Sequence, residues 1–332
     1  MSLQFIHSHD SPKVGLDAIY GVKWLPNDTV VSVSADGKAS QWNASDGAVI
    51  HSLPPHPLAL TSLSTDAEGN RALINSIEGT ISLWDLTSGE VVGKRETFDQ
   101  AKSGIDAAWS VSLHPQGGNY ASTGASGTLR ISSADPESFG NILQTLSPRT
   151  DGRNKFGLHA KYSPSGKLVG ISTEQGAVYV FDVESKAVVH SFSSHATSVR
   201  SLSWSADSQL LCSASDDRRI VLYDTRSPSA TSPNANSSTG VVASFIGHAS
   251  WVLSVDISPD GKLIASGSSD RNVKIWDLTS RQCVSTLSSS SEQSGEVWGV
   301  SWKPVAGSSA LVSTGEDGSL RWWRTAGAGA SV

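Results

Sequence analysis

A histidine, two strand serines and an aspartate in the C-terminal third of the chain have the residue types of a nucleophilic catalytic site. His248 is followed by Ser266 and Ser268 and then by Asp270. Hydrolases use such residues to deprotonate a serine and to orient the histidine that does so. However, a histidine and an acid recur at the same offset in other parts of the chain. Because a catalytic group is not duplicated in this way, the pattern favours a structural role.

The recurrence extends along nearly the whole chain, at intervals of forty to fifty-odd residues. Each interval closes with an aromatic–acidic pair or a remnant of one: Trp42-Asn43, Trp84-Asp85, Ser132-Ser133, Phe181-Asp182, Tyr223-Asp224, Trp276-Asp277 and Trp323-Arg324. Histidines precede the closing aromatic by 28 positions at His56, His195 and His248. Six positions before the closing residue stand Asp36, Glu78, Ser126, Gln175, Asp217, Asp270 and Asp317. A period and ending of this kind are typical of WD repeats, each of which supplies the four strands of a propeller blade.

The repeats predict an all-β fold, a seven-bladed WD40 β-propeller that occupies residues 1–325 as one domain. The last repeat lacks an outer strand, whereas Leu3–Ile6 has the alternation of a strand and precedes the first repeat. We expect this N-terminal strand to complete the last blade, because pairing the two ends removes exposed sheet edges. Residues 227–240 and 288–295 are predicted to be loop insertions of the disordered type, and 326–332 a flexible tail.

In WD repeats, the recurring polar residues resemble a network in which the acid orients the histidine, and the histidine reaches a strand serine and the closing aromatic. Such a network satisfies buried polar groups. The resemblance therefore assigns structural roles to three sets of residues. They are the histidines His56, His195 and His248, the acids Asp36, Asp217, Asp270 and Asp317, and the aromatics Trp42, Trp84, Trp276 and Trp323.

Composition and motifs argue against several other functions. The net charge of −6 and the absence of a Lys/Arg run argue against direct nucleic-acid binding. No apolar run is long enough for a membrane helix and no signal peptide is visible, so we expect an intracellular protein. Cys212 and Cys283 adjoin apolar strand residues and are interpreted as buried thiols. Neither metal-ligand spacing nor a phosphate-binding loop appears, so no metal and no other cofactor is predicted.

Positions that differ from repeat to repeat are the best candidates for recognition. Aligning the first strands places one residue per repeat at the entrance of the central channel: Tyr20, Thr61, Trp109, Leu158, Arg200, Leu253 and Trp298. The same surface should carry Trp251 and the acids Glu174, Asp216 and Glu316. Aromatics rimmed by acids suit a basic, hydrophobic peptide. The competing interpretation is that Trp109 and Trp298 merely pack between blades.

Several segments resemble the WD-repeat subunit of the superkiller (Ski) complex, in its fungal form. The resemblance spans all seven repeats and is most specific in Ser194–Leu211, Ala214–Asp217, Gly247–Leu253, Val273–Asp277 and Glu296–Val300. It implies a non-catalytic scaffold that binds a DExH-box RNA helicase and a tetratricopeptide protein and supports 3′-to-5′ messenger-RNA decay by the exosome. It also implies both cytoplasmic and nuclear locations, with a meiotic topoisomerase-like protein as a further partner in fungi.

The resemblance also suggests that partners dock through an arginine followed by a bulky apolar residue. The residues give an independent reason, since the three acids could accept a guanidinium and the aromatics could bury an apolar anchor. Two other functions stay open. One is an adaptor of a chromatin or ubiquitin-ligase complex that uses the same surface. The other is a propeller hydrolase or isomerase with a channel site built from Arg200, Asp216 and Glu174.

Overall fold

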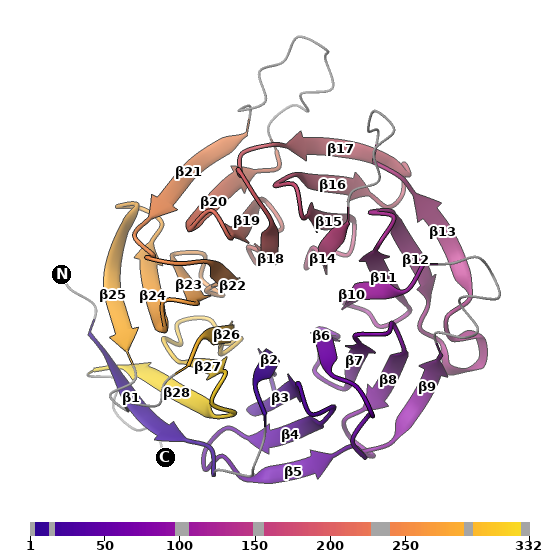
Figure 1. The fold of residues 1–332 in the computed structure, drawn as a ribbon, viewed down its shortest axis with the longest axis horizontal. Helices are drawn as coiled ribbons and strands as arrows, with labels where there is room; N and C mark the ends of the chain where they lie inside the picture. Colours follow the sequence, from indigo (N-terminus) through magenta and orange to yellow (C-terminus); the bar gives the residue numbers. More distant parts are fainter. Residues whose placement is uncertain are drawn as a thin grey trace.

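The computed structural model describes residues 4–12, 17–96, 106–148, 156–226, 240–288 and 295–326. These residues form seven four-stranded antiparallel sheets that stand around a central channel, and Figure 1 views this ring down its axis. One short 3-10 helix, η1 (Pro136–Ser138), lies in the third blade. The seven-bladed WD40 propeller predicted from the sequence is therefore confirmed. The predicted insertions fall almost wholly outside the described residues, at 227–239 and 289–294, as does the tail at 327–332.

Each blade runs from an innermost strand at the channel to an outer strand at the rim. The innermost strands are β2 (Ile19–Trp24), β6 (Leu60–Thr65), β10 (Ala108–Leu113), β14 (Gly157–Tyr162), β18 (Val199–Trp204), β22 (Val252–Ile257) and β26 (Val297–Trp302). The second strands are β3 (Thr29–Ser34), β7 (Arg71–Ser76), β11 (Asn119–Gly124), β15 (Leu168–Thr173), β19 (Leu210–Ser215), β23 (Leu263–Ser268) and β27 (Leu311–Gly315).

The third strands carry the closing aromatics and the fourth strands form the rim. The third strands are β4 (Ala39–Asn43), β8 (Ile81–Asp85), β12 (Leu129–Ser133), β16 (Val178–Asp182), β20 (Arg219–Asp224), β24 (Asn272–Asp277) and β28 (Leu320–Thr325). The fourth strands are β5 (Val49–Ser52), β9 (Val91–Arg95), β13 (Ile142–Leu146), β17 (Ala187–Phe192), β21 (Val241–Ile246), β25 (Gln282–Ser288) and, for the seventh blade, β1 (Phe5–Asp10).

The N-terminal strand closes the ring by pairing antiparallel with β28, as Figure 1 shows. The sequence pattern predicts this strand over Leu3–Ile6, but it lies over Phe5–Asp10. Leu3 lies outside the described residues, and the predicted end at Ile6 is wrong because the polar residues that follow continue the pairing with β28, with His9 among them packing inward. The ring of His9 stacks on the buried indole of Trp322, with ring centroids 4.6 Å apart.

Burial explains why the middle strands read as continuous apolar and small-residue runs. Each sheet is covered on both faces by its neighbours in the ring, so the second strands are buried along nearly their whole length. The hydrophobic clusters accordingly join adjacent blades. Trp42 of the first blade, for example, packs with Val312 and Trp322 of the seventh. Blade-to-blade burial of this kind fixes the channel wall on which the candidate site is built.

Candidate functional site

Every innermost strand contains one residue at which its pairing with the second strand shifts register. These residues are Tyr20, Thr61, Trp109, Leu158, Arg200, Leu253 and Trp298. A bulge of this type turns a side chain away from its regular direction in the sheet. All of the bulged residues line the central channel, whose volume is about 350 Å³. The positions aligned from the sequence thus lie in one ring around the channel.

The two channel tryptophans pack edge to face against aromatic rings of adjacent blades. The ring centroids of Trp298 and Tyr20 are 5.0 Å apart, and those of Trp109 and Phe156 are 5.5 Å apart. All of these side chains are half-buried and the tryptophans also face the channel. The geometry therefore combines the two interpretations of the sequence, since each indole packs between blades and contributes to the channel wall.

Phe156 belongs to this rim and is missing from the sequence-based site, and Ile77 also lines the channel mouth. Phe156 stands two residues before Leu158, the offset at which Trp251 stands before Leu253. That offset could have identified Phe156. Ile77 precedes the acid Glu78, and its side chain is 46% exposed at the channel mouth. An apolar residue this exposed strengthens the case for a recognition surface.

Arg200 and Asp216 form a bidentate ion pair within the fifth blade. Nε of Arg200 donates to Oδ1 of Asp216 at 3.0 Å, and Nη2 donates to Oδ2 at 2.8 Å. The guanidinium also lies over the indole of Trp251, 5.9 Å from the ring centroid. Asp216 was predicted to accept an arginine from a partner, and this role needs correction because the chain's own arginine already occupies the carboxylate. The pairing arises because the bulge directs Arg200 toward the turn that follows β19.

The other two predicted acids are exposed at the surface but make local contacts. Oε1 of Glu174 accepts the backbone N–H of Phe156 at 3.3 Å. Oε2 of Glu316 accepts the backbone N–H of Glu296, also at 3.3 Å. These contacts each use one carboxylate oxygen. Both acids can therefore still offer an oxygen to a ligand, unlike Asp216.

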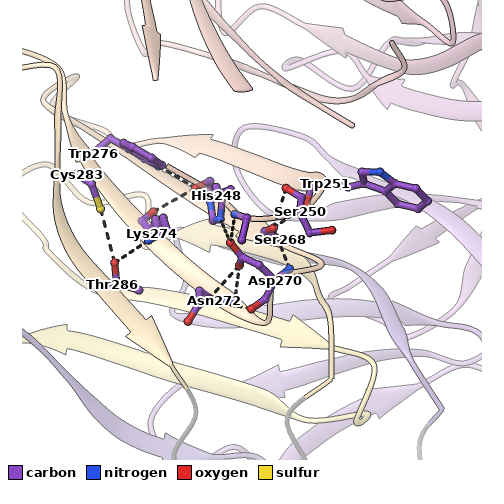
Figure 2. Close-up of polar contacts among 12 residues, drawn as sticks. His248, Ser250, Trp251, Ser268, Asp270, Asn272, Lys274, Trp276, Cys283 and Thr286 are labelled. Carbon is purple, nitrogen blue, oxygen red and sulfur yellow. Dashed lines mark hydrogen bonds and ion pairs between the residues drawn. The ribbon is translucent and has the colours of Figure 1, made fainter. Parts of the chain in front are cut away.

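The recurring polar network is complete in the fifth and sixth blades. In the sixth, Nδ1 of His248 lies 2.8 Å from Oδ2 of Asp270, and Nε2 lies 2.7 Å from Oγ of Ser266. The indole N–H of Trp276 donates to the same Oγ at 2.8 Å. Figure 2 shows this chain of contacts, with Trp251 projecting away from it. In the fifth blade the corresponding residues are His195, Asp217, Ser213 and Tyr223, with contacts of 2.9, 2.7 and 3.3 Å.

Electrostatics at these acids follow from the contacts. Burial alone would raise the pKa of Asp270, but hydrogen bonds from His248 and from the Ala249 N–H outweigh burial and hold the pKa well below its ordinary range. The pKa of Asp217 is lowered in the same way, chiefly by His195 against the effect of burial. Both carboxylates are therefore charged and fully engaged, which suits a structural role.

His56 departs from the expected network. Its Nε2 lies 3.4 Å from Oε1 of Glu78, and its Nδ1 contacts the backbone of Leu58. The strand serine is replaced by buried Ile74, so the Nε1 of Trp84 is buried without a hydrogen-bond partner among the described residues. The structural assignment of His56 and Trp84 therefore needs correction: both are present, but the network between them is not.

The first and seventh blades retain part of the network. The indole N–H of Trp42 donates to Ser32 and that of Trp323 to Ser313, each at 2.8 Å. In these two blades the acids form ion pairs with basic side chains that are close in sequence, and not with a histidine. Asp36 pairs with Lys38 and Asp317 with Arg321.

The described part of the chain contains no group of three or more His, Cys, Asp or Glu side chains arranged to hold a metal ion. Within the same ranges, no helix has the length and apolarity to cross a membrane. Cys212 is buried, and burial raises the pKa of its thiol. Cys283, in contrast, is exposed on β25, so its assignment as a buried thiol is wrong. A rim strand is covered on one face only, which sequence alternation alone did not reveal.

Comparisons with known proteins agree with this architecture. The family model for the WD domain, G-beta repeat, matches residues 186–224, 240–277 and 281–324. The chain is 28% identical to meiotic recombination protein rec14 of Schizosaccharomyces pombe, over 96% of this chain and 95% of that protein. It is 29% identical to WD repeat-containing protein VIP3 of Arabidopsis thaliana, over 75% and 77% of the two chains.

A further similarity, to COMPASS component SWD3 of Saccharomyces cerevisiae, has 31% identity over 49% of this chain and 46% of that protein. None of these names is that of an enzyme, and WD40 propellers are generally non-catalytic scaffolds. The matched repeats, the ring of seven blades and the Asp–His–Ser–aromatic contacts together show that this chain folds as a seven-bladed β-propeller of WD40 repeats.

Proposed function

We propose that this protein is a non-catalytic scaffold whose channel-mouth surface binds short segments of partner proteins. The observation that carries the proposal is the ring of bulged residues. It holds Tyr20, Trp109 and Trp298 at the channel, and the half-exposed indole of Trp251 lies under the guanidinium of Arg200, another member of the ring. Large, pre-packed aromatic side chains lose little entropy on binding and commonly dominate peptide interfaces.

The partner segment that suits this surface carries an arginine followed a few residues later by a bulky apolar side chain. Glu174 and Glu316 are exposed carboxylates at the rim and could bind the arginine. Asp216 is left out, because a partner would first have to displace Arg200. The apolar side chain would pack against the half-buried tryptophans, and a desolvated aromatic contact contributes about 2 kcal/mol.

The assembly we propose is the superkiller complex, with a DExH-box RNA helicase and a tetratricopeptide protein as partners, in support of 3′-to-5′ messenger-RNA decay in the cytoplasm. Support comes from the motif resemblance over 194–300. A nuclear role with a meiotic topoisomerase-like partner is supported by the similarity to a meiotic recombination protein along almost the full length of both chains.

Affinity purification followed by mass spectrometry tests the assembly. We expect an RNA helicase and a tetratricopeptide protein to be recovered with the wild-type chain. Trp109→Ala and Trp298→Ala should each lower the affinity for both partners by about tenfold, which corresponds to a change of about 1.4 kcal/mol in binding free energy. Cys283→Ser, on the outer rim, is the matched control. If both tryptophan variants fold and bind with unchanged affinity, the partners must bind the side or the opposite face of the propeller.

A second candidate is an adaptor of a chromatin complex, favoured by the partial similarity to a COMPASS component. The same purification distinguishes the two. Recovery of a chromatin-modifying complex without the helicase would favour the adaptor. The channel-enzyme alternative is less favoured, because Arg200 and Asp216 neutralise each other in a bidentate pair.

A further inference from the structure

The wall of the channel below the bulged ring has a repeating hydrogen-bond pattern. In the second blade, Ser62 and Ser64 of β6 accept the backbone N–H groups of Val111 and Leu113 in the next blade, at 3.1 and 2.9 Å. The same contact recurs from Ser110 to Ala160, Ser112 to Tyr162, Ser201 to Val255, Ser203 to Ile257, Ser254 to Val300 and Ser301 to Trp24. A serine is thus the ordinary residue at these positions, where it joins one blade to the next.

The fourth blade breaks this pattern with titratable side chains. His159 and Lys161 occupy the two serine positions of β14, and both line the channel. Within the described ranges, no side chain of β14 accepts a backbone N–H from β18. The first blade carries Lys23 at the second of these positions and the sixth carries Asp256. His159, Lys161 and Lys23 replace a serine acceptor, whereas Asp256 keeps the contact by accepting the backbone N–H of Trp302. The three residues at the second position, Lys23, Lys161 and Asp256, place charge in the channel.

The charges do not cancel. Nζ of Lys23 lies 3.7 Å from Oδ2 of Asp256. That carboxylate also accepts hydrogen bonds from the Ser203 hydroxyl at 2.9 Å and from the Trp302 N–H at 3.0 Å. At the mouth, Arg200 is paired with Asp216. Lys161 has neither an ion pair nor a side-chain hydrogen bond among the described residues, so it adds one uncompensated cation to a narrow channel.

A histidine with an unused nitrogen lies beside this lysine. Nδ1 of His159 is buried and has no hydrogen-bond partner among the described residues. Burial, and then the charge of Lys161, lower the pKa of His159 to about 3, so the ring is neutral near pH 7. A neutral imidazole carries one N–H, which it can donate to an oxygen atom. An uncompensated ammonium and an imidazole two residues apart on one strand are suitable donors for an oxyanion.

We propose that the channel binds a small oxyanion of the phosphate class, with Lys161 as its main anchor and with Lys23 and His159 beside it. A volume of about 350 Å³ is within the range of small-molecule sites. Asp256 would oppose an anion, but Lys23 offsets its charge, and the Ser203 hydroxyl and the Trp302 N–H already occupy its oxygens. This site lies below the peptide-binding surface and does not depend on the proposed function.

Binding should depend on pH through Lys161. Burial, and then Lys23, lower the pKa of Lys161 to about 8. The ammonium is the form that binds an anion, so affinity should be highest near pH 7 and should fall as the pH rises through about 8. The other groups that face Lys161 are Lys23, Asp256 and the neutral His159.

Isothermal titration calorimetry of the full chain with inorganic pyrophosphate at pH 7 tests the site. We expect one ion bound per chain and at least about a tenfold loss of affinity in Lys161→Ser, as for removal of a charge-assisted hydrogen bond. Serine is the residue that four other blades carry at this position (Ser64, Ser112, Ser203 and Ser301), so this variant should fold. Lys161→Met supplies a second test with a side chain of similar length. Lys167→Ser removes an exposed lysine of the same blade and should bind like the wild type.

Sulfate provides the pH test, because its charge is constant between pH 7 and 9. Its affinity for the wild type should fall over this range, while that of the Lys161 variants should stay low throughout. The absence of pyrophosphate binding by the wild type would overturn the proposal. Equal losses in the Lys161 and Lys167 variants would also do so, since they would show a general charge effect. Unchanged binding in both Lys161 variants would place the ion elsewhere.

Discussion

The sixth and fourth blades show that one backbone architecture can be built with and without the polar network. The sixth blade closes with Trp276, whose indole binds Ser266 and, through it, His248. The fourth closes with Phe181; Ile171, ten residues earlier, holds the place of the strand serine, and Gln175 stands at the position of the acid. Both blades form four-stranded sheets, and their closing aromatics are equally buried, at 2% and 1% exposure. Blade geometry therefore follows from apolar burial, and the network satisfies the polar atoms that some blades also bury.

In most blades, the type of the closing residue is matched to the type of the residue ten positions earlier. A closing side chain that has a donor is matched by a serine ten residues earlier, as in Trp42 with Ser32 and Trp323 with Ser313. Phe181 has no donor and is matched by an isoleucine. The second blade is the exception, because it combines Trp84 with Ile74 and leaves a buried N–H unpaired among the described residues. Unpaired buried groups cost free energy, so the blades should differ in their response to mutation.

The largest expected effect comes from removing the central histidine of the network. His248→Ala leaves the buried carboxylate of Asp270 without its side-chain partner. This change should lower the free energy of unfolding by about 3 kcal/mol. His56→Ala removes a looser, partly exposed contact and should cost less than about 1 kcal/mol. Urea unfolding of the two variants measures both values. Equal losses would show that the complete network contributes no more than the incomplete one.

The second effect is the loss of the stabilising contribution of Asp270 at low pH. The folded-state pKa of Asp270 is below its value in the unfolded chain, so its contribution is present above about pH 4 and is lost as the pH falls through the folded-state pKa. Asp270→Asn should therefore destabilise the protein by about 2 kcal/mol at pH 6 and by less at pH 3. Thermal unfolding at the two pH values measures the difference. A cost that does not vary with pH would argue against this charge-dependent stabilisation.

A smaller difference in unfolding free energy should distinguish two closing tryptophans that are buried to the same extent. Trp276→Phe removes the donor to Ser266, whereas Trp84→Phe removes an N–H that has no partner among the described residues. Both lose the same atoms, so the difference between their unfolding free energies isolates the hydrogen bond. We expect Trp276→Phe to be more destabilising by about 1 kcal/mol. Identical costs would mean that the indole–serine contact adds no net stability.

The smallest effect is a gain in the fourth blade. Lys161→Ser should restore the acceptor that the other blades offer to the next inner strand, here to the backbone N–H of Trp204. It also removes a partly buried, uncompensated ammonium. The free energy of unfolding should rise by about 0.5–1 kcal/mol, measured in a buffer without multivalent anions. A loss of stability instead would mean that the lysine stem contributes packing that the serine cannot replace.

The sequence by itself determined the number of blades, the ring closure and the positions that line the channel. These features follow from local signals, namely strand alternation, turn residues and fixed offsets within each repeat. The offset that locates Trp109 and Trp298 therefore holds in every blade. The sequence also predicted that an N-terminal strand closes the ring, although the observed strand covers Phe5–Asp10.

The tertiary structure alone decided which of these residues are free to bind. Asp216 is occupied because a bulge turns Arg200 toward it, and Phe156 joins the rim by packing on Trp109. Lys161 and Lys23 lie more than a hundred residues apart in the chain, yet ring closure brings both into one channel. No period relates such residues. Their proximity arises from the packing of blades that only the closed ring brings together.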